Sequence, residues 1–318
     1  MAAYALRRLL WAVPVLWAVA TITFFLMHAV PGGPFTQDKA LPPAVNDALN
    51  RRYHLDKPVW EQYGLYLWDS VHGDLGLSFQ GDRSVTEIIR NTFFVTAQLG
   101  VLGFLVAVVI GMTLGTMSAL NHNGPLDYVG VAFSTIGASV PSFIMGAFLV
   151  IFFAVDLGWF KTLGWGGPRH LTGLLDPFAW DWRRMVLPVV AISTLPTAFI
   201  ARITRASVLE VLNQDYIRTA RAKGLAEVRV VLRHTIKNAM IPVLTLMGPI
   251  FANLVAGSFI IETMFSIPGL GRELVNAVIR RDYAMIMGTT LFFTLIITLA
   301  NLAVDLAYAV VDPRIRYR

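Results

Sequence analysis

Residues Ala201 to Pro242 read ARITRASVLEVLNQDYIRTARAKGLAEVRVVLRHTIKNAMIP, a charged stretch between two apolar runs. Only Glu210, Asp215 and Glu227 oppose its basic residues, which are Arg202, Arg205, Arg218, Arg221, Lys223, Arg229, Arg233 and Lys237. Apolar side chains recur at helical spacing on both sides of Gly224, and a glycine after basic residues is typical of a helix C-terminus. The stretch therefore predicts two helices separated by a glycine, a unit larger than a simple connector.

The remainder of the chain is dominated by long uncharged segments. Of its 318 residues, 56% are apolar and only 14% are charged, which is typical of a membrane protein. Segments without Asp, Glu, Lys or Arg run over residues 9–37, 91–126, 128–155, 185–201, 238–261 and 283–304. A helix needs about 20 residues to cross the bilayer, and the short fourth segment is extended if Arg202 reaches the interface. The pattern predicts an all-α polytopic membrane protein with six transmembrane helices.

These segments divide the chain into three parts. Residues 1–30 form an N-terminal transmembrane helix, and residues 31–92 form a cap segment on the outer side of the membrane. Residues 93–312 form a core of five transmembrane helices that contains the charged loop 203–238, named here the basic loop. Within the second span, Gly111 and Gly115 provide a small-residue face for close helix packing.

The distribution of basic residues predicts the orientation. Both sides carry equal numbers of Lys and Arg, but the segments assigned to the outside are about twice as long, and the positive-inside rule gives most weight to charges near the span ends. We therefore expect both termini and the basic loop in the cytoplasm. Arg7 and Arg8 resemble the start of a signal peptide, but the following apolar run is too long and lacks a clear cleavage site, which predicts an uncleaved first span.

Polar side chains within the spans are candidates for a translocation pathway. Ser139 and Ser142 flank Pro141 in the third span, where a proline forms either a kink or part of a water-filled path. Asn253 and Ser258 occupy the fifth span and are further pathway candidates. Asp305 lies near the cytoplasmic end of the last span, and its cost in the membrane predicts a structural ion pair with Arg202, or with Arg205.

Motifs for several other activities are missing from the sequence. It contains no phosphate-binding G-x-x-x-x-G-K-[ST] loop, no H-E-x-x-H, no G-x-S-x-G and no cysteine, and its His residues are scattered. We therefore expect no catalytic residue and no metal site. The basic loop lacks the interleaved aromatic residues of nucleic-acid-binding surfaces, so no nucleic-acid partner is expected.

The basic loop also resembles a known family. Gly224, followed after nine residues by His234-Thr-Ile-Lys237, has the spacing of the coupling loop of bacterial ATP-binding-cassette (ABC) importers. The run Arg218-Thr-Ala-Arg-Ala-Lys-Gly224, with Arg233-His234 after it, looks like the dipeptide, oligopeptide and nickel permeases. Further matching segments cover nearly the whole chain: Pro31–Phe35, Tyr53–Pro58, His72–Gly76, Val140–Phe143, Ile261–Thr263, Ile267–Gly271, Arg281–Tyr283 and Asp312–Arg316. The pattern most resembles the B-type oligopeptide permease subunit. Arg218 departs from the wider class, which has Glu there, so the ion pair of that Glu is not carried over.

The resemblance implies a fold, partners and a mechanism. The fold is that of type I ABC importer (MetI-like) permeases in the bacterial inner membrane. The partners are a second, C-type permease subunit, one or two ATP-binding-cassette ATPase subunits that bind ATP and Mg, an extracytoplasmic peptide-binding protein, a peptide substrate and membrane lipid. This chain itself holds no cofactor. The ATPase-coupling residues are Asp215, Tyr216, Arg218, Thr219, Ala220, Arg221, Ala222, Lys223 and Gly224.

Two alternatives stay open at this point. A dipeptide or nickel permease would share the same coupling loop, and the sequence of the spans does not separate these substrates. A secondary transporter would need paired carboxylates or broken inverted repeats within the membrane, for which Asp305 is the one candidate.

Overall fold

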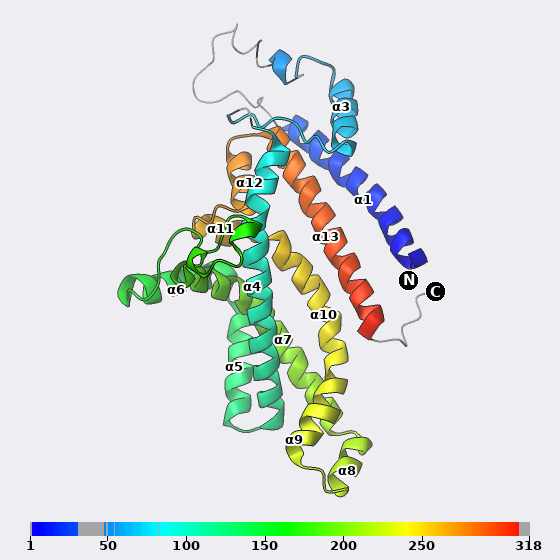
Figure 1. The fold of residues 1–318 in the computed structure, drawn as a ribbon, viewed down its shortest axis with the longest axis vertical. Coiled ribbons are helices and arrows are strands. Elements are labelled where there is room, and N and C mark those ends of the chain that lie inside the picture. The colour runs from blue at the N-terminus through cyan, green and yellow to red at the C-terminus, as the bar shows by residue number, and fades with distance from the viewer. Residues whose placement is uncertain (1, 31–47, 49, 54, 82, 312–318) are drawn as a thin grey trace.

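The computed structural model describes residues 2–30, 48, 50–53, 55–81 and 83–311 (Figure 1). Over these residues the chain is helical and contains no strand; Leu77 and Ser84 form an isolated bridge. The α-helices are α1 (Ala2–Ala29), α3 (Val59–Val71), α4 (Val85–Leu120), α5 (Pro125–Ser139), α6 (Ser142–Leu149), α7 (Trp182–Leu212), α8 (Asp215–Ala222), α9 (Glu227–Arg229), α10 (Ile236–Ala256), α11 (Phe259–Met264), α12 (Leu270–Ile279) and α13 (Tyr283–Val311). Two π-helical turns, η1 (Val150–Asp156) and η4 (Val230–Thr235), and two 3-10 turns, η2 (Leu171–Gly173) and η3 (Pro177–Ala179), complete them.

Six apolar spans are present in the described part of the chain, but one of them is bent. Five helical segments are long and apolar enough to cross a membrane by themselves: Leu6–Ala29, Val85–Leu120, Trp182–Leu212, Glu227–Met264 and Tyr283–Val304. The sixth is the pair Pro125–Ser139 and Ser142–Asp156, whose axes differ by 108°. The all-α prediction is confirmed, and the break in the third span lies at Pro141, where the sequence predicts either a kink or part of a water-filled path.

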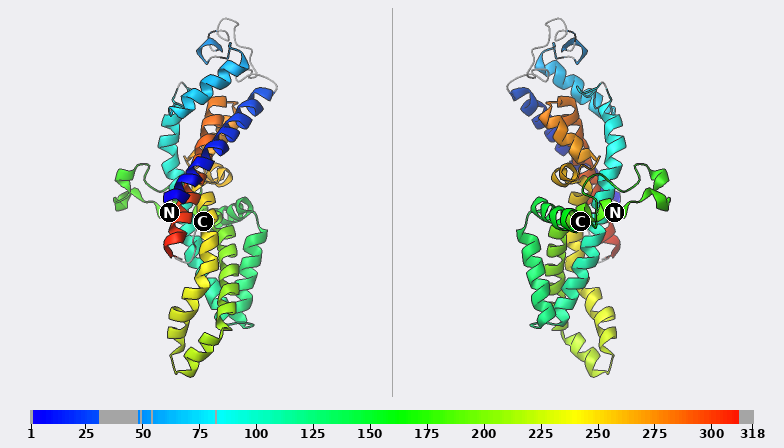
Figure 2. Two further views of the ribbon diagram at one scale, coloured as in Figure 1. Left: turned by 90° about the vertical axis from the view of Figure 1, so that its right-hand side faces the viewer. Right: turned by 90° about the vertical axis from the view of Figure 1, so that its left-hand side faces the viewer.

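The bend in the third span has a local cause. Pro141 cannot donate a backbone hydrogen bond, and it disfavours the helical conformation for the residue before it. Val140 is accordingly extended, with φ −91° and ψ 119°. The helix therefore ends at Ser139 and restarts at Ser142, so that α6 and η1 project sideways from the bundle (Figure 2).

The fifth span also ends earlier than the sequence predicts. We expected a helix to Ile261, but α10 ends at Ala256 because Gly257 adopts φ +94°, a conformation that terminates a helix and is easily accessible only to glycine. The chain then forms the short hairpin of α11 and α12. The last span, in contrast, runs from Tyr283 to Val311 as expected.

The core of the bundle is the contact between α4 and α7, with α10 packed against both. The small-residue face predicted on α4 lies in this contact. A Cβ atom on Gly111 would lie 2.8 Å from the Ile200 side chain, and one on Gly115 would lie 2.7 Å from Cβ of Thr204. The two glycines thus allow the backbones of α4 and α7 to approach closely.

The cap segment 31–92 is described only in part, because residues 31–47, 49, 54 and 82 lie outside the described residues. Helix α3 begins directly after Pro58. Helix α4 begins directly after Ser84, whose side chain makes no capping hydrogen bond. Helix α3 lies at the opposite end of the molecule from α8 and α9 (Figure 1).

Candidate functional site

The basic loop folds as a compact unit at one end of the molecule (Figures 1 and 2). Helix α7 extends beyond the bundle to Leu212, and the chain turns at Gln214, which is extended with φ −75° and ψ 147°. The first helix of the predicted pair is thus two helices, α7 and α8, because Gln214 interrupts the expected periodicity. After Gly224, α9 and η4 carry the chain back to α10.

Helix α8 presents a polar face to solvent and an apolar face to the loop itself. Ile217 and Ala220 are buried against Val230, with Val211 and Leu225 packed around them. The exposed predicted coupling residues are Asp215, Tyr216, Arg218, Thr219, Arg221, Ala222, Lys223 and Gly224. Ala220 is the exception in this set, because it belongs to the small core that holds α8 in place.

Gly224 terminates α8 with a Schellman motif. Its N–H donates to the Arg221 carbonyl at 2.9 Å, and the Leu225 N–H donates to the Ala220 carbonyl at 3.3 Å. Gly224 itself has φ +75°, and no atom lies within 4 Å of the position its Cβ would take. Backbone conformation rather than lack of space therefore requires glycine here.

Ion pairs and hydrogen bonds brace the loop. Arg221 donates to both carboxylate oxygens of Glu227, at 2.6 and 3.1 Å, and these bonds raise the pKa of Arg221. Asp215 and Arg218 form only a solvent-exposed pair at 3.6 Å. Asn238 on α10 donates to the Tyr216 hydroxyl at 3.1 Å. These contacts connect the helices of the basic loop to one another and to α10. They allow the basic loop to transmit a movement as one rigid body.

The predicted pathway residues gather at two helix breaks. Ser139 ends α5 and donates to the Thr135 carbonyl at 2.8 Å, Pro141 precedes α6, and Ser142 is its first residue. Asn253 is exposed on α10. Ser258 caps α11 by accepting from the Ile261 N–H at 3.4 Å. Helix α6 packs against α11, but no hydrogen bond between described side chains joins the two groups.

An ion pair that the sequence analysis did not identify joins three helices near the α4–α5 turn. Asp127 at the start of α5 accepts from Arg205 on α7 at 2.6 and 2.8 Å, from the Ser118 hydroxyl on α4 at 2.5 Å, and from the Asn123 N–H at 2.9 Å. The one feature of the sequence that could have indicated this pair is that Asp127 is the single charged residue between two long uncharged segments. Arg205 was considered as a partner of Asp305 but is bound to Asp127.

The predicted pair of Arg202 and Asp305 stays a prediction. The Arg202 guanidinium donates to the Ser134 carbonyl at 3.4 Å and makes no ion pair with a carboxylate that the structure describes. The side chain of Asp305 lies outside the described residues. Arg202 belongs to α7 and Asp305 to α13, and α10 packs between these two helices (Figure 1).

A second buried carboxyl group organises the α11–α12 hairpin. Glu262 is fully buried, and its Oε2 accepts from the Arg272 N–H at 3.2 Å, while Oε1 has no hydrogen-bond partner among the described residues. The Thr96 hydroxyl of α4 accepts from the Leu270 N–H at 2.8 Å. A Cβ on Gly269 would lie 2.9 Å from the Glu262 Cδ. The carboxyl group thus lies at the N-terminus of α12, where a negative group is favourable.

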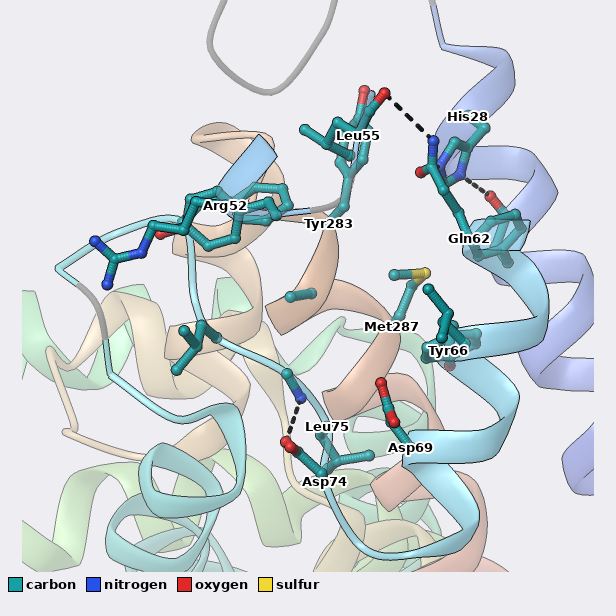
Figure 3. Close-up of a pocket in the computed structure, with 17 residues that line it drawn as sticks. His28, Arg52, Leu55, Gln62, Tyr66, Asp69, Asp74, Leu75, Tyr283 and Met287 are labelled. Atoms are coloured by element: carbon teal, nitrogen blue, oxygen red, sulfur yellow. Dashed lines mark hydrogen bonds between the residues drawn. The ribbon is translucent and has the colours of Figure 1, made fainter. Parts of the chain in front are cut away.

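A cavity of about 270 Å³ lies at the opposite end of the molecule from α8, between α1, α3 and the start of α13 (Figure 3). His28 contacts the Gln62 amide at 3.1 Å on one wall, and Asp69 and Asp74 line another. Burial raises the pKa of Tyr66, which also lines the cavity. Among the described residues, no group of three or more His, Asp or Glu side chains has the arrangement of a metal site.

Comparison with known proteins identifies the family. Residues 108–317 match the family of binding-protein-dependent transport system inner membrane components. The oligopeptide transport system permease proteins OppB of Haemophilus influenzae and Salmonella typhimurium are 41% and 43% identical to the chain over 318 residues, covering 100% of each sequence. The dipeptide transport system permease protein DppB of Bacillus subtilis is 39% identical, covering 99% of this chain and 98% of its own.

Solved structures agree with this fold. An inward-facing crystal form of the MetNI methionine ABC transporter has a TM-score of 0.55 at 16% sequence identity, covering 71% of this chain and 97% of its own. An amino acid ABC transporter solved with histidines has a TM-score of 0.51, covering 72% of this chain and 95% of its own. The likeness shows a shared MetI-like fold. The membrane-spanning helices and the full-length similarity establish that this chain belongs to the family of binding-protein-dependent transport system inner membrane components, the permease subunits of ABC importers.

Proposed function

We propose that the chain is one permease subunit of an ATP-driven oligopeptide importer. The observation that carries this proposal is the identity of 41–43% over the full chain to oligopeptide permeases. The similarity to a dipeptide permease at 39% keeps a dipeptide importer as the second candidate. In either case a second, C-type permease subunit completes the pathway, and an extracytoplasmic binding protein delivers the peptide.

The basic loop supports a coupling role for α8. Its exposed face, which includes Tyr216 and Arg218, is available to an ATPase subunit, while Ile217 and Ala220 fix the helix to the loop. A force on α8 reaches α7 through Val211 and reaches α10 through the bond from Asn238 to Tyr216. Closure of the ATPases around ATP and Mg, which those partners bind, would then rock the spans.

The pathway itself is proposed at the two helix breaks. Ser139 and Ser142 flank the bend at Pro141, and Asn253 and Ser258 lie near the end of α10. Broken helices expose backbone polar groups, which are tolerated at membrane depth only where they face protein or a water-filled cavity. In this proposal the chain lies in the bacterial inner membrane, with the basic loop and both termini in the cytoplasm, where the ATPases are.

Purification of the tagged chain from its native membrane tests the proposal. We expect a second permease, one or two ATPases and, on addition of peptide, the binding protein, whose bound ligand identifies oligopeptide or dipeptide. Recovery of a homo-oligomer without an ATPase would contradict the assignment and favour a secondary transporter. For the pathway, cysteines at Ser139 and Asn253 should react with water-soluble thiol reagents in at least one nucleotide state, and protection in every state would contradict it.

A further inference from the structure

A cavity of about 260 Å³ lies between α4, α5 and α7, next to the ion pair of Asp127 and Arg205. Its walls include both arginines of α7, Arg202 and Arg205, and the hydroxyl-bearing residues Ser118, Ser134 and Thr135. Neither the coupling role of α8 nor the pathway residues proposed above use this cavity.

The two arginines are in different electrostatic states. Arg205 is neutralised by Asp127, which accepts from its Nε and Nη2. Arg202 is exposed, donates only one long bond, 3.4 Å to a backbone carbonyl, and faces no carboxylate that the structure describes. Ser118 and Ser134 already donate, to Asp127 and to the Gly130 carbonyl. Arg202 therefore brings a positive charge to the cavity without a described acid to balance it.

The cavity lies at one edge of the membrane core. Helix α7 begins at Trp182, whose exposed ring is typical of a membrane interface. Twenty residues of helix from there to Arg202 span about 30 Å, the thickness of the hydrocarbon core. Arg202 therefore lies at the opposite interface. The turn between α4 and α5 and the basic loop lie toward the same end of the molecule (Figure 1), the cytoplasmic end if the orientation in the proposed function holds.

The surface that leads from the cavity toward the membrane centre is apolar. Leu195, Phe199 and Arg202 share one face of α7, and Leu195 and Phe199 are 38% and 44% exposed. Val131 and Thr135 lie one turn apart on α5, and Val131 is 42% exposed. An acyl chain fits such a surface, whereas a water-filled peptide path would favour polar side chains. The cavity is also smaller than the sites of about 300 Å³ or more that enclose drug-sized ligands.

We propose that this cavity binds the phosphate of an anionic phospholipid, with Arg202 as the charged ligand, in place of the Asp305 pair that the sequence predicts, and with the acyl chains along Leu195 and Phe199. Basic pockets between transmembrane helices at the cytoplasmic interface bind such head groups. Because α7 continues directly into the basic loop, a bound lipid would hold the part of α7 next to the basic loop against α5.

Native mass spectrometry of lipids retained by the complex tests this assignment. The chain and its co-purifying partners are reconstituted in nanodiscs of phosphatidylglycerol and phosphatidylethanolamine in equal amounts and then released into mild detergent. The wild type should retain phosphatidylglycerol preferentially. Arg202→Gln should lower that enrichment about fivefold, the effect of one basic residue at an anionic surface, and Arg202→Lys should largely preserve it. Arg229→Gln, which removes a charge from the basic loop away from the cavity, is the matched control.

Three outcomes would overturn the proposal. Unchanged enrichment in Arg202→Gln, with a normal elution profile, removes the role of this residue. An equal loss in Arg229→Gln shows a general charge effect. In the third outcome, Arg202→Gln retains lipid normally but no longer takes up tri-alanine in preference to tri-alanine amide. That result would assign Arg202 to the carboxylate of the peptide instead. Lipid retention does not depend on an ATPase, so failure of the importer assignment would be seen separately, in the subunits that co-purify.

Discussion

Replacing Asp127 with Asn keeps the shape of the side chain and removes its charge. Asp127 has a side chain only 5% exposed and accepts four hydrogen bonds from α4, α7 and the α4–α5 turn, two of them from Arg205. An amide oxygen can replace only one of the two acceptor atoms. Two of the four donors then face an NH₂ group, and the Arg205 charge loses its partner.

The cost follows from the burial of the pair. Breaking a buried ion pair by removing one partner costs about 3–5 kcal/mol. The Arg205 side chain is 26% exposed and retains some hydration, so we expect about 3 kcal/mol, at the lower end of that range. Replacing both partners by uncharged groups leaves no isolated charge, so Asp127→Asn with Arg205→Gln should be destabilised less than the sum of the two single variants.

The assay is the free energy of unfolding of the detergent-solubilised chain in a double-mutant cycle. Asp215→Asn is the control, because that carboxylate has a side chain 98% exposed and a pair at 3.6 Å, for which about 0–1 kcal/mol is expected. Additive losses in the double variant, or an Asp127→Asn loss no larger than the Asp215→Asn loss, would refute the idea that the pair clamps α4, α5 and α7 together.

Three further predictions rest on single contacts. Gly224→Ala should lower the stability of the C-terminal end of α8 by about 1–2 kcal/mol, the cost of a left-handed conformation for a residue other than glycine, and should reduce ATP-driven peptide uptake. Gly224→Asn should reduce both less. Equal uptake by the wild type and the two variants would contradict this reasoning. Gly269→Ala should reduce the yield of folded protein, because the added Cβ would lie 2.9 Å from Cδ of the buried Glu262. Gly64→Ala is the control and should fold normally, because the space around that position is open. Comparable yields of the two variants would contradict the predicted clash. The hydrogen bond from Lys161 lowers the pKa of Asp181, so the stabilisation that this pair gives the loop is present above the ordinary pKa of about 4 and is lost as the pH falls through the lowered value. Hydrogen exchange of the loop should show that loss in the wild type and a smaller loss in Lys161→Gln, where Arg184 still pairs with Asp181 at 3.3 Å; an equal loss in both proteins would contradict the role of Lys161.

The sequence by itself determined the class of this protein, because membrane insertion depends on local composition. A helix satisfies its own backbone hydrogen bonds, so each long uncharged segment specifies a span without reference to the others. The same holds for the end of α8, because a left-handed residue after basic residues requires glycine at position 224. The small-residue face of α4 was also predictable from glycines four residues apart, but only the structure showed that α7 packs against it.

The tertiary structure decided which polar groups meet. Asp127 and Arg205 are 78 residues apart, and Leu270 is 174 residues from Thr96, so their contacts depend on how the helices are arranged rather than on any local pattern. The bend at Pro141 was ambiguous for the same reason, because a proline in a membrane helix produces a mild kink or a sharp break according to what the freed backbone groups can contact. Long-range pairing of charges in the membrane is governed by the cost of leaving them isolated, and the packed fold establishes the partner of each.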